Sequence, residues 1–189
     1  MNLDYRSLGW RLALICVVTV VVQVAAISQV RILGFNADVV PLVAASVGLI
    51  VGSLPGAIFG FALGMLVDFA LVETVGVDSL ILLAIGYGAG RLRELRDPQG
   101  AIVPLLVGAA ATAAAQLGFW LLTFLLGQRV PLGWALIWEL LGTIALNAAI
   151  AIPVYLIVRR SLLAALPEDP RRRRRRAYTT GGLSPLSKS

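Results

Sequence analysis

The sequence predicts an all-α integral membrane protein with six transmembrane helices and both termini in the cytoplasm. Its residues are 59% hydrophobic and 14% charged, with a mean hydropathy of +0.89. A soluble domain would carry about a quarter charged residues. The apolar residues also form long runs that contain almost no charge, and arginine gathers at alternate ends of these runs. Together, these observations favour a protein that crosses the membrane several times.

The chain divides into a predicted membrane domain, residues 1–166, and a basic cytoplasmic tail, residues 167–189. About 20 apolar residues are needed to cross the hydrocarbon of a bilayer. The expected spans are 11–30, 38–53, 55–72, 79–92, 101–126 and 134–158. The tail is rich in proline, arginine, serine and glycine, and this composition predicts disorder.

The uncharged run from Val39 to Val67 is too long for one ordinary span, because a single helix there would extend roughly 43 Å. Pro55 interrupts the run. A residue before proline resists the helical conformation, whereas proline suits the first turn of a new helix. We therefore expect two short helices joined by a tight turn.

The basic residues predict the orientation. With the N-terminus inside, 14 of the 16 lysines and arginines lie on the cytoplasmic side, as the positive-inside rule requires. A single helix over residues 39–72 would invert everything after it. Four crossings with a non-spanning fourth helix would keep the same parity and stay open as an alternative. The predicted cytoplasmic anchors are Arg91, Arg93, Arg171, Arg172, Arg173, Arg174, Arg175 and Arg176.

A stripe of small residues ending in an acid marks the expected third helix. It consists of Gly56, Gly60, Gly64 and Asp68. Residues four apart share one helix face, and glycines at this spacing let another backbone approach closely. An acid in the membrane usually faces protein or water. The stripe is predicted to contact another helix, in this chain or in a partner. An ion pair of Asp68 with Arg31 or Arg129 is a further hypothesis.

Other polar and small residues within the spans predict helix contacts. The polar candidates are Asp38, Gln116, Glu139 and Asn147. Interhelical hydrogen bonds are expected for the two amides, whereas Glu139 follows two tryptophans and is expected to extend toward the membrane surface. Close packing is predicted for the glycine run Gly86, Gly88 and Gly90 near the end of the fourth helix. Gly86, Tyr87 and Gly90 are predicted to contact another helix or a partner.

The composition argues against catalysis. The chain has no histidine, one cysteine (Cys16) and one lysine (Lys188). This excludes an intrachain disulfide, the usual His/Cys metal sites and a lysine-containing phosphate loop. No serine has a recognisable nucleophile setting. We expect no catalytic residue, metal or cofactor, and the arginine block on a membrane protein does not predict nucleic-acid binding.

An ordered set of motifs runs from residue 37 to residue 93. These motifs are Ala37-Asp38, Ser53-Leu54-Pro55-Gly56-Ala57, the stretch from Gly60 to Asp68, Gly76-Val77-Asp78-Ser79-Leu80, and the stretch from Gly86 to Leu92. Their order and spacing resemble the bacterial rod shape-determining protein MreD family. That family typically has a Pro-Asp pair before its second helix, and this chain has Ala37 where the proline is usual.

The resemblance implies a non-enzymatic scaffold of the cell-elongation complex, located in the bacterial inner membrane. The implied partners are an MreC-like protein, the peptidoglycan synthases and, indirectly, the MreB filament, together with membrane lipids. It also implies an architecture similar to the S-component of ECF transporters. The alternative is a substrate-binding membrane subunit of a small-solute (vitamin) transporter, with an outward pocket lined by Asp38, Asp68, Glu139 or Asn147.

Overall fold

The computed structural model describes residues 5–27, 31–32, 35–72, 74–95, 102–127 and 133–163. Its elements are α1 (Tyr5–Val22), a π-helical turn (Gln23–Ile27), β1 (Arg31–Ile32), β2 (Phe35–Asn36), α2 (Val40–Val51), α3 (Ser53–Leu71), α4 (Val77–Leu95), α5 (Ile102–Leu125) and α6 (Trp134–Leu163). The two short strands pair antiparallel, with Arg31 opposite Asn36. The fold of the described residues is otherwise helical. The predicted tail, including Arg171–Arg176, lies outside them.

Among the described residues, four helices are long and apolar enough to cross a membrane: residues 7–25, 53–71, 102–125 and 136–162. By contrast, α2 has 12 residues, about 18 Å of helix, which is shorter than the hydrocarbon of a bilayer. The 19 residues of α4 include charged side chains at both ends. The chain is therefore an all-α membrane protein, and six crossings remain a prediction.

The break between α2 and α3 lies at Gly52, three residues before Pro55. Gly52 has a φ of 115°, a left-handed conformation that glycine adopts without steric cost. Pro55 then lies in the first turn of α3, where its missing N–H breaks no helical hydrogen bond. The turn is therefore a single glycine, and Pro55 lies within the first turn of the next helix instead of making the break.

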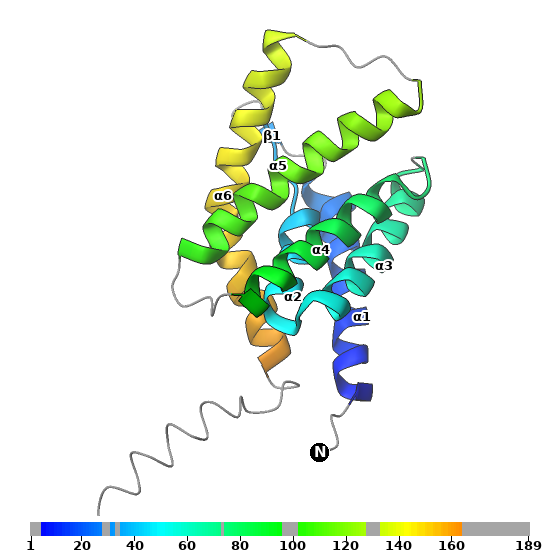
Figure 1. Cartoon of the computed structure of the whole chain (residues 1–189), viewed down its shortest axis with the longest axis vertical. Helices are drawn as coiled ribbons and strands as arrows, with labels where there is room; N and C mark the ends of the chain where they lie inside the picture. Colours follow the sequence, from blue (N-terminus) through cyan, green and yellow to red (C-terminus); the bar gives the residue numbers. More distant parts are fainter. Residues whose placement is uncertain are drawn as a thin grey trace, which may run out of the picture.

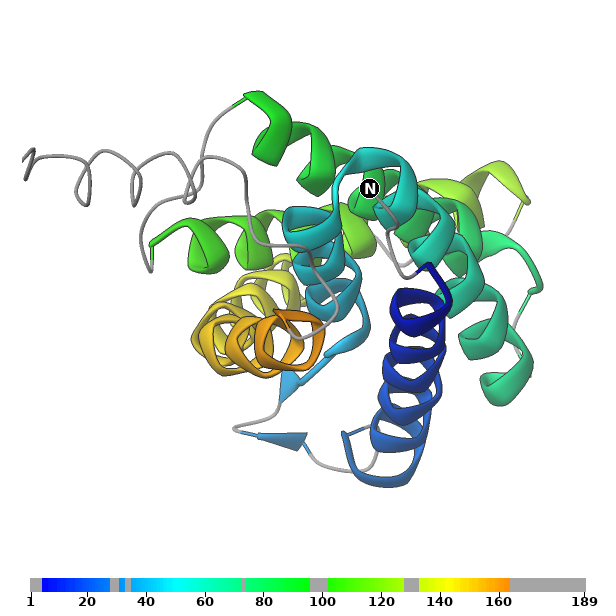
Figure 2. The same cartoon turned by 90° about the horizontal axis from the view of Figure 1, so that it is seen from below.

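Helix α2 forms the centre of the molecule. Every residue from Val40 to Ile50 is buried, and Figure 2 shows α2 between α6 on one side and α1 on the other. A helix that is apolar all round belongs in the interior of a larger protein. Its neighbours include Leu63 of α3 and Leu82 of α4, both buried in the same hydrophobic cluster. The short α2 is therefore shielded from lipid by the longer helices.

Several helix ends lie together at one end of the molecule. The Arg11 guanidinium donates to the Ser161 carbonyl at 2.7 Å, which joins the start of α1 to the end of α6. Figure 1 shows the α2–α3 turn and the end of α4 toward the same end. This arrangement agrees with the predicted placement of the basic residues on one side of the membrane.

Candidate functional site

Helices α3 and α4 run antiparallel, and glycines lie between them where they approach most closely. We call this contact the glycine seam, made by Gly56, Gly60 and Gly64 of α3 and Gly86 and Gly90 of α4. A Cβ atom at Gly56 would lie 2.7 Å from the Gly86 carbonyl oxygen, and one at Gly60 would meet the Leu82 carbonyl. Only hydrogen fits at these positions, so the two backbones pack directly against each other.

The seam continues to both ends of the hairpin with the same register. A Cβ at Gly64 would meet the backbone of Ser79, and one at Gly90 would meet the backbone of Ser53. Each step of about four residues along α3 thus matches a similar step back along α4. Residues four apart lie on one helix face, which explains why the seam extends over most of both helices.

A third helix joins the seam at its middle. A Cβ at Gly48 of α2 would meet the Gly86 carbonyl, and one at Gly56 would lie 2.7 Å from the Gly48 Cα atom. Three helices therefore meet at three glycines. The structure brings the predicted stripe against α4 and α2 of the same chain, so its glycines do not form an exposed groove.

Asp68 lies at the far end of the seam and is only 1% exposed. Its carboxylate accepts hydrogen bonds from the Gly76 N–H at 2.7 Å, the Asp78 N–H at 3.3 Å and the Ser79 hydroxyl at 3.1 Å. The first N–H groups of a helix have no intrahelical acceptor and carry partial positive charge. Asp68 of α3 therefore caps the first turn of α4.

The sequence did not reveal this partner of Asp68. Arg129 lies outside the described residues, as does the side chain of Arg31, so the hypothesis of an ion pair with either stays untested. The hydrogen bonds of Asp68 run to the turn that begins α4. The sequence did contain a signal for this contact. Gly76 and Ser79 follow Asp68 closely, at the point where the next helix begins.

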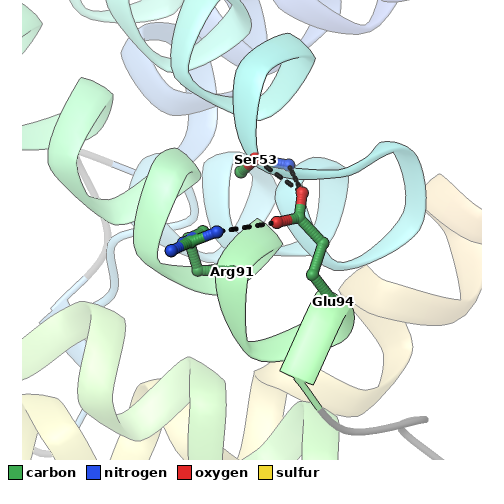
Figure 3. Close-up of polar contacts among 3 residues, drawn as sticks. All are labelled: Ser53, Arg91 and Glu94. Atoms are coloured by element: carbon green, nitrogen blue, oxygen red, sulfur yellow. Dashed lines mark hydrogen bonds and ion pairs between the residues drawn. The ribbon is translucent and has the colours of Figure 1, made fainter.

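Glu94 plays the corresponding part at the opposite end of the hairpin, as Figure 3 shows. Its carboxylate accepts hydrogen bonds from the Ser53 N–H at 3.1 Å and the Ser53 hydroxyl at 2.6 Å. The Ser53 hydroxyl is the main reason that the pKa of Glu94 lies below its ordinary value of 4.5. Each helix of the hairpin thus supplies an acid from its last turns to the first turn of the other.

The two arginines near Glu94 also have partners within the chain. Arg93 donates to the Ile50 carbonyl near the end of α2, a position where a cation is favoured by the helix dipole. Arg91 lies 3.4 Å from the Glu94 carboxylate and 6.0 Å from the ring centre of the exposed Tyr87. The predicted anchoring role of Arg91 and Arg93 stays a prediction, and Tyr87 faces outward instead of joining the seam.

A second polar cluster, the asparagine junction, links α6 to α5 and to the start of α2. The Asn147 side chain is fully buried. Its oxygen accepts from the Asp38 N–H at 3.1 Å, and its amide nitrogen donates to the Thr112 hydroxyl at 3.2 Å. The side-chain oxygen of Gln23 accepts from the N–H of Val39, the residue next to Asp38. The contribution of Thr112 was missed because it lies in an alanine-rich stretch.

The side chains of the remaining polar candidates form no hydrogen bond within either cluster. Gln116 is half-buried on α5 and Glu139 is exposed on α6. Asp38 takes part in the asparagine junction through its backbone, while its carboxylate accepts from the Val40 N–H. Within the described ranges, no three His, Cys, Asp or Glu side chains gather to hold a metal ion. The buried polar groups act on the protein's own backbone and side chains.

These contacts define a class: a helical membrane protein built from packed hairpins whose buried acid and amide groups hold helix ends together. The family model for the rod shape-determining protein MreD matches residues 5–163, and the chain belongs to this family. The resemblance noted in the sequence is thereby confirmed. No curated protein and no solved structure matches the chain, so the likeness to ECF transporter subunits remains a prediction.

Proposed function

We propose that this chain is a non-enzymatic membrane scaffold in the complex that elongates rod-shaped bacteria. Membership of the MreD family carries the proposal, because it makes the chain a bacterial membrane protein that determines rod shape. The structure supports a scaffold in particular because its buried polar groups stabilise helix contacts. Asp68 is bound by the α4 turn, and Asn147 is bound by Asp38 and Thr112.

The proposed partners are an MreC-like protein and the peptidoglycan synthases, with the MreB filament engaged indirectly. Because the glycine seam is filled from within the chain, partner helices would meet the outward faces instead. Tyr87 on α4 and Trp138 on α6, 46% and 63% exposed, lie on two such faces. The proposed topology has six crossings with both ends in the cytoplasm, and the clustered helix ends in Figure 1 support it.

The geometry does not favour the vitamin-transporter alternative. A solute pocket would need polar side chains free to bind a ligand. Asp68 and Asn147 are 1% and 0% exposed and are engaged in hydrogen bonds. Freeing either group would leave a buried N–H or hydroxyl unsatisfied, at a cost of about 1–3 kcal/mol.

Depletion in a rod-shaped host tests the proposed function. The expected result is widening and rounding of the cells, with rescue by the full-length chain and co-purification of an MreC-like protein. Rod shape that persists together with a new vitamin requirement would contradict the scaffold and support transport. Rescue should fail for Gly60→Ala and succeed for Gly88→Ala, because a Cβ at Gly88 has nothing within 4 Å.

A further inference from the structure

An apolar cavity of about 440 Å³ lies between the α3–α4 hairpin and the end of α5. Its walls come from the middle of α3, the α3–α4 turn, the start of α4 and the last turn of α5. The main side chains in these walls are Phe61, Met65, Val75, Leu80, Leu122 and Leu125. Among the described residues that line it, only Thr74, at the turn, carries a hydroxyl group. The cavity is thus a hydrocarbon-lined space open at the side of the molecule.

The lining of this space favours neither bound water nor an empty cavity. A buried water needs two to four polar partners, whereas apolar cavities stay dry or take up apolar molecules. An empty space of this size would also deprive its lining atoms of dispersion contacts. Because α3 and α5 are long and apolar enough to cross a membrane, we expect lipid beside the part of the cavity that these helices form.

We propose that the acyl chain of a membrane lipid occupies this cavity. The cavity is continuous with the lipid-facing surface, since Leu80 and Leu125 line it and are also 56% and 68% exposed. Phe61 lies ten residues before the end of α3, so the cavity reaches roughly 15 Å inward from the turn along the helix axis. A tail entering beside Thr74 would follow α3 toward the membrane interior.

The size of the cavity favours an acyl chain over a partner helix. A helix about 10 Å across fills 440 Å³ in roughly one turn. A slender, flexible chain matches a narrow space between two hairpins better, and it needs no polar partner. The bound tail would fill the gap between α5 and the α3–α4 turn. This inference depends on membrane insertion and not on the proposed role in cell shape.

Photolabelling of the full-length chain in nanodiscs tests the proposal. The probe is a phosphatidylethanolamine with a diazirine on its acyl chain, and labelled sites are mapped by peptide mass spectrometry. In the native chain, label should concentrate at residues 61–65, 74–80 and 122–126. Leu122→Trp should lower this labelling about tenfold. The matched variant Leu121→Trp should leave it unchanged, because Leu121 is exposed and outside the cavity.

The distribution of label on the native chain tests the proposal even if Leu122→Trp fails to fold. Label spread evenly over all lipid-facing apolar residues would show ordinary surrounding lipid and overturn the proposal. So would a stable dimer that excludes label from these three segments, because a second copy would then fill the cavity. Concentrated labelling that a folded Leu122→Trp protein retains in full would contradict it as well.

Discussion

The two hairpins of this molecule are built in opposite ways. In the α3–α4 hairpin, glycines at matching four-residue steps bring the backbones together, and Asp68 and Glu94 cap the two ends. In the α5–α6 hairpin, the helices meet where Gly108 packs on Ala151 and Asn147 bonds to Thr112. Beyond that crossing they diverge, as Figure 1 shows.

The difference lies in where the glycines face. In the N-terminal half of α6, Gly142 faces the ring of Phe35, and in α5, Gly118 faces Ile81 of α4. These glycines serve other contacts, so they leave α5 and α6 with a single close approach. A repeated small residue closes a hairpin when its stripe faces the backbone of the opposite helix over several turns, as it does from Gly56 to Gly64. One polar junction fixes a crossing point but not the whole length.

The largest effect should come from Gly60→Ala in the seam. The new methyl group would meet the Leu82 carbonyl, and the two backbones would have to separate. We expect a loss of more than about 3 kcal/mol in the free energy of unfolding, seen as poor yield and a lowered Tm in detergent. The control is Gly88→Ala on α4, where a Cβ meets nothing within 4 Å. Equal stability of the two variants would contradict the direct backbone contact at Gly60.

Asp68→Asn should have the next largest effect. Its amide group would direct N–H donors at the N–H groups of the α4 turn, where the carboxylate now accepts. We expect a loss of about 2–3 kcal/mol in unfolding free energy. The matched change Glu139→Gln lies on an exposed face of α6 and should shift stability by less than about 0.5 kcal/mol. An Asp68→Asn variant with unchanged unfolding free energy would contradict the capping role of Asp68.

Asn147→Leu should weaken the more open hairpin at its crossing. The change leaves the Asp38 N–H without its acceptor and removes the donor to Thr112. Hydrogen bonds between membrane helices contribute about 1–2 kcal/mol, and we expect a loss of that size by denaturant unfolding in mixed micelles. Gln116→Leu is the control, because no hydrogen bond joins its side chain to another described residue. A larger loss for Gln116→Leu than for Asn147→Leu would contradict the role of the asparagine junction.

The smallest effect concerns the pH dependence at the Glu94 end. A lowered pKa means that the ionised carboxylate is favoured in the folded state. Its contribution is present above the ordinary value of 4.5 and is lost as the pH falls through the lower folded-state pKa. Glu94→Gln should therefore lower Tm at neutral pH, and its Tm should approach that of the native chain as the pH falls below the folded-state pKa of Glu94. Two parallel curves of Tm against pH would contradict this sign.

The sequence contained the signals for local structure but not those for long-range partners. Four-residue glycine spacing and Pro55 predicted one stripe and one break, because both act within a helical turn or two. The seam register, the caps of Asp68 and Glu94, and the Thr112–Asn147 contact depend on how distant segments return. Gly88 shows the limit: it belongs to the same glycine run as Gly86, but its place on the helix turns it outward.

The enclosure of α2 by its neighbours could not be predicted from the sequence, for a similar reason. Its hydrophobic run predicted a span at 38–53, yet the helix covers only Val40–Val51. Hydrophobicity alone does not separate a helix enclosed by protein from one exposed to lipid. Burial of the whole helix by its neighbours is a property of the assembled fold.

Distances between spin labels in nanodiscs test the central contrast most directly. One label pair, at Ala62 and Leu80, lies across the closed hairpin. The other pair, at Leu121 and Ile137, lies near the end of α5 and the start of α6. All four side chains are exposed. We expect the α3–α4 pair to give the shorter distance, as the glycine seam requires. Equal distances, or a shorter distance for the α5–α6 pair, would contradict the account of one closed and one open hairpin.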